Sequence, residues 1–272
     1  MGKFDGVLLV SDYDDTLYGK NLTVSEENRA AIADFIAQGG RFTVATGRAR
    51  ATFLPQISRE KLTLNAPVIL SNGSSIYDFA ADKPVYQSFL PEAAAEHMEQ
   101  VCAAFPELSF EAYHGEDIYV YNPNAVTMKH MERVGVPYVS CRTVGEMPLP
   151  WTKLILEQDH PLLVQVQELV LSRWADLYEA IFSNTYLLEI TAKGNTKGAL
   201  VTLLADKLGI VPEHIYCIGD NQNDISMLKA AAIGFAPANC APEVRAAGAC
   251  IVSDCDHHAI AQVIRILAGR YS

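Results

Sequence analysis

The sequence predicts an α/β protein: a core with a parallel sheet, interrupted by a second α/β domain. Two observations support this. Short apolar runs alternate with helical patterns near both ends of the chain, and the middle of the chain has a different texture. Unbroken apolar runs are typical of strands buried on both faces, and strand–helix alternation predicts parallel strands joined by right-handed crossovers. We assign residues 1–80 and 191–272 to the core and residues 81–190 to the inserted domain.

The first core segment alternates strands and helices in order. Three apolar runs predict strands at residues 7–10, 42–45 and 67–70. A helix is expected from about Ser25 to Gln38, because Ile32, Phe35 and Ile36 share one face and two glycines follow. The segment Thr23-Val24-Ser25-Glu26 has the spacing of a capping box. A second helix is expected after Thr46-Gly47-Arg48.

The second core segment resumes the alternation near Thr196. It predicts helices at 196–208, 223–232 and 258–267, and strands at 215–218, 234–236 and 250–252. The inserted domain is expected to hold helices at 93–104, 125–134 and 161–175. Its expected strands are 85–90, 109–113, 118–121, 153–157, 178–183 and 187–191. The alternation of Ser109-Phe110-Glu111-Ala112-Tyr113 indicates a sheet with one wet face. His97 and His130, on the expected helices, should then face solvent.

The composition narrows the function classes. The net charge of −11 argues against nucleic acid and anionic membranes as partners, because both require a concentrated positive patch. No apolar stretch reaches the length of a membrane span, and no secretory signal is visible at the N-terminus. The six cysteines form no C-x-x-C pair, which favours reduced thiols in a cytoplasmic protein over a zinc site. The oligomeric state is left open.

Candidate catalytic groups follow the first predicted strand. Asp12 and Asp14 lie just past its carboxyl end, where open α/β sheets bind ligands. The pattern Asp-x-Asp alone is weak, since Asp254-Cys255-Asp256 repeats it where a helix cap is the simpler explanation.

Three further segments strengthen this assignment. Thr46 and Gly47 follow the second strand, where a hydroxyl and backbone N–H groups can cradle a phosphate. Lys197 stands near the start of a predicted helix and can supply positive charge. Asp220 and Asp224 follow the strand at 215–218, and carboxylate oxygens are the ligands that Mg²⁺ prefers.

In this order and setting, the four segments resemble the motifs of the haloacid dehalogenase superfamily of phosphatases. Asp12-x-Asp14-x-Thr16 resembles its first motif, Thr46 the second, Lys197 the third and Gly219-Asp220-x-x-Asn223-Asp224 the fourth. The insertion between the second and third motifs, preceded by Ser71-Asn72-Gly73, is similar to the Cof-type subclass. That resemblance implies a Rossmann-like core with an inserted α/β cap. Asp15 departs from it, because the family often has glycine there, and Tyr13 stands where a smaller apolar residue is common.

The resemblance also implies roles for individual residues. Asp12 would be the nucleophile that forms an aspartyl-phosphate, and Asp14 the general acid and base. Mg²⁺ would be held by Asp12, the main-chain carbonyl of Asp14, Asp220 and Asp224. The phosphate would be held by Thr46, the N–H groups of Tyr13 and Gly47, Lys197 and Asn223. The substrate is expected to be a small phosphorylated metabolite, with sugar phosphates the leading class.

The inserted domain is expected to close over the site and select the leaving group. Candidate substrate contacts are Arg48, His114, Asp117, Tyr119, Tyr121, Lys153 and Glu189. Each has a plainer alternative: the two tyrosines could simply pack on a sheet face, Lys153 could guard a strand edge, and Arg48 could pair with a surface acid.

Three rival functions remain open from the sequence. A signalling receiver domain also carries an acidic cluster, a threonine, a lysine and Mg²⁺, but it is much shorter and has no inserted domain. A phosphomutase of the same superfamily and a non-catalytic phospho-ligand binding protein are the other two.

Overall fold

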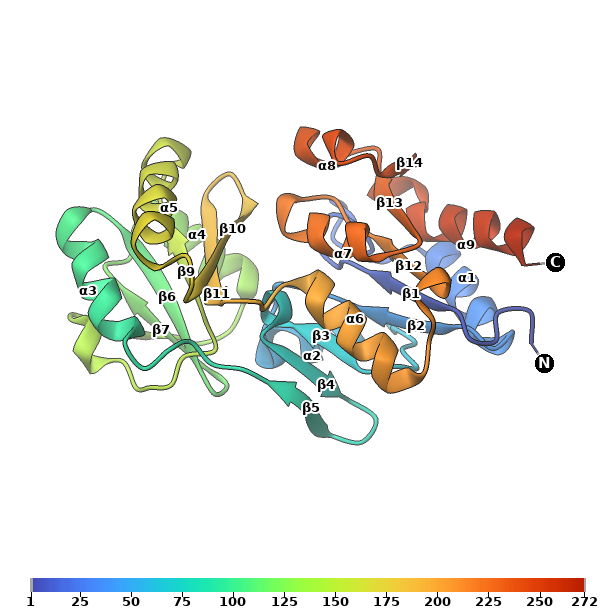
Figure 1. The fold of residues 1–272 in the computed structure, drawn as a ribbon, viewed down its shortest axis with the longest axis horizontal. Helices are drawn as coiled ribbons and strands as arrows, with labels where there is room; N and C mark the ends of the chain where they lie inside the picture. Colours follow the sequence, from blue (N-terminus) through green and yellow to red (C-terminus); the bar gives the residue numbers. More distant parts are fainter. Residues whose placement is uncertain (1, 272) are drawn as a thin grey trace.

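The computed structural model describes residues 2–271 and has the predicted class: a parallel core sheet and an inserted α/β domain (Figure 1). The core sheet has five strands in the order β14-β13-β12-β1-β2, all parallel. In that order they span Cys250–Val252, Ile233–Pro237, Ile215–Ile218, Leu8–Ser11 and Arg41–Val44. Strand β1 is therefore flanked by β12 and β2, and the carboxyl ends of all three lie at the same edge.

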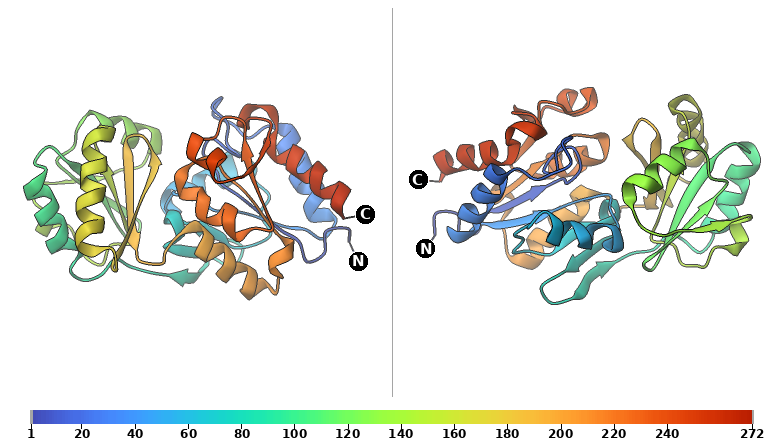
Figure 2. Two further views of the ribbon diagram at one scale, coloured as in Figure 1. Left: turned by 45° about the horizontal axis from the view of Figure 1, so that its top comes forward. Right: turned by 180° about the vertical axis from the view of Figure 1, so that it is seen from behind.

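Helices cover both faces of the core sheet (Figure 2). Helices α1 (Glu26–Ala37) and α9 (Ala259–Arg270) pack on one face, and α6 (Lys197–Leu208) and α7 (Ile225–Ala230) on the other. Within β1, Leu9 joins the first hydrophobic cluster, while Leu8 and Val10 join the second. Burial on both faces explains why this strand is an unbroken apolar run. Helix α2 (Arg50–Arg59) and the short α8 (Pro242–Ala246) complete the core.

A small antiparallel sheet extends the core beside β2. It contains β3 (Val68–Leu70), β4 (Ser75–Asp78) and β5 (Lys83–Gln87), and an isolated bridge between Ala45 and Ile69 links it to the end of β2. The strand expected at 85–90 was therefore wrongly placed in the sheet of the inserted domain. It pairs with β4 because Val85 and Tyr86 pack against the core cluster that contains Ile76.

The inserted domain has a six-stranded mixed sheet in the order β10-β11-β9-β6-β7-β8. In that order its strands span Tyr178–Asn184, Leu187–Ala192, Lys153–Glu157, Ser109–His114, Asp117–Tyr121 and Val139–Cys141. Helices α3 (Ala94–Ala104) and α5 (His160–Trp174) cover one face, and α4 (Ala125–Val134) covers part of the other.

The prediction of one wet face on this sheet is wrong. All residues of Ser109–Tyr113 are buried, and Glu111 has no exposed surface. Helix α4 covers the polar face and supplies ionic partners to it. His130 on α4 is likewise not solvent-facing, and His97 on α3 stacks on Trp174 with its Nδ1 2.8 Å from the Tyr178 hydroxyl. Alternation in a strand identifies its two faces but not what covers the second one.

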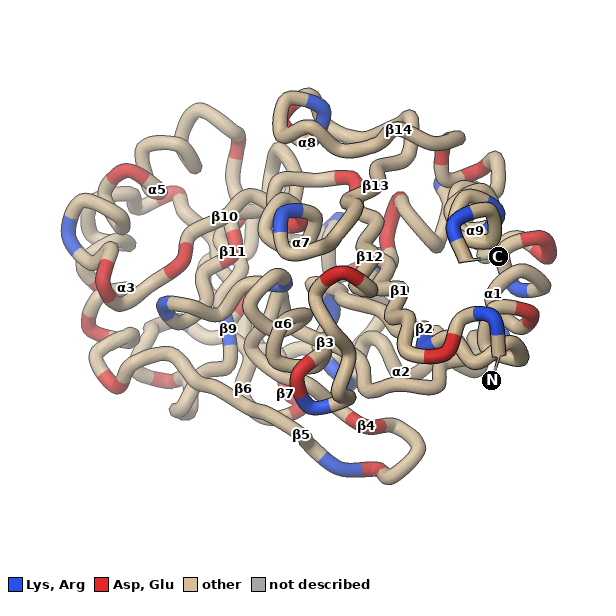
Figure 3. Tube along the Cα trace, turned by 45° about the vertical axis from the view of Figure 1, so that its right-hand side comes forward, with Lys and Arg blue, Asp and Glu red and all other residues tan. Residues whose placement is uncertain are grey.

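The cap of α1 also differs from the prediction. Ser25 is the N-cap, and its hydroxyl accepts from the Asn28 N–H. The Thr23 hydroxyl instead donates to Glu60 at 3.2 Å, because Thr23 still lies in the preceding loop. No helix among the described residues is long and apolar enough to cross a membrane. Acidic and basic residues are interspersed over both domains (Figure 3).

Candidate active site

The loop after β1 places Asp12 at the edge where three strands end. Its N–H donates to the Ile218 carbonyl of β12 at 2.8 Å, which fixes the loop against the neighbouring strand. The next side chain, Tyr13, turns into the core, where it is fully buried and stacks on Tyr18. Position 13 can therefore contribute only its backbone to the site. This accommodates the tyrosine in place of a smaller apolar residue.

Four buried ionic side chains converge beside this loop. The Lys197 ammonium, from the start of α6, lies 2.5 Å from Asp12 Oδ1 and 2.6 Å from Asp224 Oδ1. The second oxygen of Asp224 accepts from the N–H groups of Asp220 and Asn221 at 2.9 and 3.0 Å. The Thr16 hydroxyl donates to Asp220 at 3.0 Å. Residues more than 180 positions apart in the chain thus form one cluster.

The charges of this cluster are not balanced by protein alone. Burial and repulsion from Asp224 raise the pKa of Asp12 well above its usual range, although Lys197 opposes the shift. Burial, again with repulsion from Asp224, raises the pKa of Asp220 to about 7. Three carboxylates therefore share a single buried lysine.

This cluster fits a divalent cation. Asp12, Asp220 and Asp224 each offer an oxygen, and the three oxygens lie within 4.8 Å of one another. A hard cation with oxygen ligands, such as Mg²⁺, would neutralise the excess negative charge.

The second acidic residue, Asp14, is held by Arg48. The guanidinium donates to both carboxylate oxygens, at 2.8 and 2.7 Å. Burial alone would raise the pKa of Asp14, but the hydrogen bonds and charge of Arg48 outweigh it and lower the pKa below its usual value. Asp14 is therefore an ion locked by a bidentate pair. The Arg48 side chain, expected either to touch substrate or to pair with a surface acid, pairs with Asp14 at the site.

The expected phosphate cradle lies at the end of β2. Thr46 is buried and its hydroxyl accepts from the Arg48 N–H at 3.1 Å. Asn223 donates to Asn72 Oδ1 at 3.0 Å. The Nδ2 of Asn72 is buried and finds no acceptor among residues 2–271, which leaves a spare donor beside the cradle. Sequence reasoning noted Asn72 only as part of a family-like segment.

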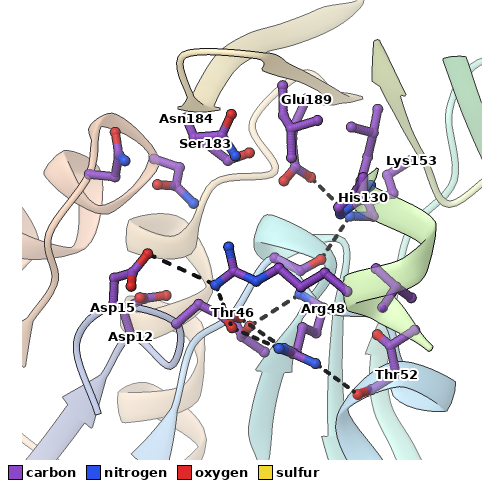
Figure 4. A pocket seen from close by; sticks show the side chains of 18 of the residues that line it. Asp12, Asp15, Thr46, Arg48, Thr52, His130, Lys153, Ser183, Asn184 and Glu189 are labelled. Carbon is purple, nitrogen blue, oxygen red and sulfur yellow. Dashed lines mark hydrogen bonds and ion pairs between the residues drawn. The ribbon is translucent and has the colours of Figure 1, made fainter. Parts of the chain in front are cut away.

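The inserted domain forms the opposite wall of a pocket over these groups (Figure 4). Lys153 on β9 donates to the Gly47 carbonyl of the core at 2.8 Å and to Glu189 Oε2 on β11 at 2.9 Å. Strand β9 lies between β11 and β6, so Lys153 does not guard a strand edge. Both Lys153 and Glu189 line the pocket.

Four other expected contacts lie outside the pocket. Successive side chains of β6 and β7 point alternately toward the pocket and away from it, and the face that points away carries His114, Tyr119 and Tyr121. The two tyrosines on that face pack against the hydrophobic cluster beneath α3 and α5. The His114 ring bonds the Pro150 carbonyl at 2.9 Å. Asp117 is exposed at the turn between β6 and β7. The expectation of substrate contacts from His114 and Tyr119 is therefore not supported, because both side chains lie on the face of the cap sheet that points away from the pocket.

Sequence reasoning missed several pocket residues. Arg133 on α4 reaches across to Asp14 at 3.6 Å and Asp15 at 4.0 Å. Ser183 and Asn184, the last two residues of β10, and His130 on α4 also line the pocket. The signals for these residues are slight: His130 and Arg133 are spaced i, i+3 and so share a helix face, but nothing in the sequence says which face meets the core.

Asp15 adopts a left-handed backbone conformation with φ of 58°. Glycine is favoured in this region, and asparagine and aspartate are tolerated there, which gives a physical reason for the usual glycine. The side chain at this position lines the pocket and faces Arg133. Aspartate in place of the usual glycine thus adds a core carboxylate that can pair with Arg133 of the inserted domain.

Comparison with known proteins agrees with this geometry. Residues 9–264 match the family model described as haloacid dehalogenase-like hydrolase, and the chain belongs to that family. It is a phosphatase of subclass IIB, the Cof-type, and its inserted domain is the cap.

Three known phosphatases are similar to this chain over nearly their whole length. The chain is 27% identical to the 5-amino-6-(5-phospho-D-ribitylamino)uracil phosphatase YwtE of Bacillus subtilis, over 96% of this chain and 98% of that protein. It is 26% identical to the pyridoxal phosphate phosphatase YbhA of Escherichia coli, over 94% and 97%. The structure of the subclass IIB sugar phosphatase BT4131 superposes with a TM-score of 0.85 at 22% identity, covering 96% of this chain and 98% of that one.

Gly219 provides a test of how tightly the cluster is packed. A Cβ at this position would lie 2.4 Å from Asp224 Cγ and 2.5 Å from Asp224 Cβ, so Asp224 would have to shift. Replacing Gly219 by alanine is expected to weaken the affinity for Mg²⁺ by roughly 10–100-fold, the usual cost of disturbing groups that orient a metal site. Isothermal titration with MgCl₂ measures this. Gly269→Ala is the control, because its added Cβ would meet no atom within 4 Å apart from its chain neighbours and the backbone of its own helix. An unchanged affinity in Gly219→Ala would contradict the packing argument.

Proposed function

We propose that this phosphatase is Mg²⁺-dependent and hydrolyses small phosphate esters, sugar phosphates first among them, through an aspartyl-phosphate on Asp12. The observation that carries the proposal is the convergence of Asp12, Asp220, Asp224 and Lys197 beneath a pocket closed by the cap. The named activities of the similar proteins, on 5-amino-6-(5-phospho-D-ribitylamino)uracil, pyridoxal phosphate and sugar phosphates, support small metabolites as the substrate class.

The chain supplies a nucleophile and its support. Lys197 holds one oxygen of Asp12, which leaves the other carboxylate oxygen to attack phosphorus in line with the leaving oxygen. Thr46, the Gly47 N–H and the spare donor of Asn72 would bind the non-bridging oxygens. Asp12, the Asp14 carbonyl, Asp220 and Asp224 would hold Mg²⁺. When bound, the ion would neutralise negative charge on the transferred phosphoryl group.

Asp14 would protonate the departing oxygen and then take a proton from the water that hydrolyses the aspartyl-phosphate. The Arg48 pair holds Asp14 ionised before substrate binds. We infer that the phosphate dianion draws the Arg48 guanidinium away from Asp14, because both anions compete for the same bidentate donor. Asp14, relieved of its partner and placed beside the added negative charge, would then take up from the solvent the proton that it later donates to the departing oxygen.

The test is hydrolysis of p-nitrophenyl phosphate and of a panel of phosphorylated metabolites, with Mg²⁺ and with EDTA. We expect turnover with Mg²⁺ and its loss in EDTA, recovered by added MgCl₂. Turnover that persists unchanged in EDTA would contradict the metal proposal. Interconversion of sugar phosphates without release of inorganic phosphate would instead indicate a mutase. A preference for non-sugar phosphates within the panel would contradict only the expectation that sugar phosphates are the main substrates, and not the phosphatase activity.

A further inference from the structure

His130 is part of the pocket wall that the cap contributes. It lies on α4, its side chain is 17% exposed, and it faces the pocket that Asp12 and Arg48 line from the core side (Figure 4). The nucleophile and phosphate groups of the core lie across this pocket, so the cap wall is where the leaving group of a bound ester must sit. The proposed catalytic, metal-binding and phosphate-binding groups do not include this histidine.

Two buried carboxylates hold the His130 ring. Its Nδ1 lies 2.7 Å from Glu111 Oε1 and 3.0 Å from Glu157 Oε1, and neither glutamate has exposed surface. The glutamates come from the neighbouring strands β6 and β9, so the sheet fixes them. The other oxygen of Glu111 accepts from the Tyr113 hydroxyl at 2.7 Å, which restrains it further.

This environment favours the charged imidazolium. Burial lowers the pKa of His130, but the hydrogen bonds and charges of Glu111 and Glu157 outweigh burial and raise it to about 9. Burial and repulsion from Glu111 raise the pKa of Glu157 to about 7, so two buried carboxyl groups side by side favour a cation between them, and the imidazolium supplies it. The ring therefore carries a proton on both nitrogens at neutral pH.

The second ring nitrogen, Nε2, has no hydrogen-bond partner within residues 2–271. Nδ1 is occupied by the glutamates, and no acceptor for Nε2 is found among the described residues. A protonated Nε2 is a donor, whereas the Nε2 of a neutral ring with its proton on Nδ1 would be an acceptor. Arg133 and Lys153, the other cap cations in the pocket, already contact carboxylates. The Nε2 of His130 is thus a charged cap donor in the pocket with no acceptor among residues 2–271.

We propose that His130 donates a hydrogen bond from Nε2 to an oxygen of the leaving group of the bound phosphate ester, and that Glu111 and Glu157 are positioning residues for it. The inference rests on the proposed phosphatase activity and adds a residue that selects among its substrates. An ester whose leaving group carries a hydroxyl, carbonyl or carboxylate oxygen satisfies the donor. An ester with a purely hydrocarbon leaving group leaves it unpaired, which lowers the stabilisation of the bound state.

The test compares His130→Gln with the native protein. The two substrates are phenyl phosphate, whose leaving group bears no further oxygen, and the best oxygen-bearing ester found among sugar phosphates, glycerol phosphate and phosphoglycerate. The measured quantity is kcat/KM for the oxygen-bearing ester divided by kcat/KM for phenyl phosphate. A loss of activity that affects both substrates equally cancels in this ratio. We expect His130→Gln to lower this ratio about tenfold. The control is His97→Gln on α3, which lies outside the pocket and should leave the ratio unchanged.

The pH profile of the same ratio separates hydrogen bonding from a structural role. The imidazolium exists below its pKa of about 9, so the native ratio should fall as the pH rises through that value. Glu157→Gln removes one of the carboxylates that raise the His130 pKa, so the fall should move to lower pH. Other charged or titratable groups facing His130 are Glu111 and Tyr113 on β6, Lys153 on β9, Glu189 on β11, Arg133 on α4, and Asp14, Asp15 and Arg48 across the pocket.

An unchanged ratio in a folded His130→Gln protein would overturn the inference. So would a pH profile that does not move in Glu157→Gln, even if His130→Gln fails to fold. Failure of the phosphatase proposal is distinguishable, because the native protein would then release phosphate from neither ester.

Discussion

Replacing Asp12 by asparagine is expected to lower kcat by about four orders of magnitude or more, the scale seen when an essential nucleophile or its partner is removed. The amide cannot attack phosphorus, while Lys197, Asp220 and Asp224 remain in place around it. The measurement is steady-state hydrolysis of p-nitrophenyl phosphate with Mg²⁺, with far-UV circular dichroism to verify folding.

The chain supplies a matched control for this substitution. Asp254 belongs to the second Asp-x-Asp pair, where it accepts from the Asp256 N–H and contacts His257 in a surface turn. The sequence assigned this pair to capping, and Asp254 does cap the short turn before α9. Asp254→Asn should therefore retain full activity. Comparable activity in Asp12→Asn, or an equal loss in Asp254→Asn, would remove the distinction between the two pairs.

Replacing Lys197 by methionine is expected to destabilise the protein strongly as well as inactivate it. The ammonium is fully buried between Asp12 and Asp224, and burial of the two carboxylates without it leaves negative charge uncompensated. Removing one partner of such a group costs roughly 3–5 kcal/mol of unfolding free energy. Under the proposed mechanism Lys197 also neutralises charge on the transferred phosphoryl group, so its loss should lower kcat by about 10²–10³-fold.

Urea denaturation in EDTA measures the stability change, because a bound cation would otherwise replace part of the missing charge. Lys229→Met is the control, since Lys229 is exposed on α7 and in no ion pair among the described residues. Added MgCl₂ should restore more stability to Lys197→Met than to the native protein, because its cluster holds more uncompensated negative charge. A Lys197→Met protein as stable as the native one in EDTA would show that the cluster does not depend on the lysine.

The core could be predicted closely from the sequence because its strands are buried on both faces. Strand β12 spans Ile215–Ile218 and β14 spans Cys250–Val252, both as expected, and the loops after β1 and β12 carry the clustered carboxylates. Parallel strands end at one edge of the sheet, so residues that follow different strands meet there. The order of strands in the sequence is therefore enough to predict where the core site lies.

The cap wall could not be predicted in the same way. Glu111 lies on a strand in which polar and apolar residues alternate, and such a pattern predicts that the polar side chains face solvent. Only the packing of α4 over this face shows that Glu111 is buried. Likewise, Arg133 meets Asp14 and Asp15 only because the cap sits over the core in this arrangement. Contacts between two domains depend on their relative placement, and no local pattern encodes that. The sequence accordingly named two cap residues that line the pocket, Lys153 and Glu189, and four that do not: His114, Asp117, Tyr119 and Tyr121.

The backbone conformation of Asp15 also could not be predicted from the sequence. The left-handed conformation of Asp15 follows from the tight turn after β1, where its carbonyl accepts from Asn239 Nδ2 at 2.9 Å. The sequence records only an unusual residue at a position where glycine is frequent. Its consequence, a carboxylate that faces Arg133, required the turn geometry.

Mass spectrometry of the acid-quenched enzyme during turnover tests the identity of the nucleophile most directly. With Mg²⁺ and substrate, the account predicts one phosphoryl group on the peptide that contains Asp12. The group should accumulate in Asp14→Asn, which can no longer activate water, and be absent from Asp12→Asn. A phosphoryl group on a different residue, or phosphate released at every quench time from an enzyme that is never labelled, would contradict it.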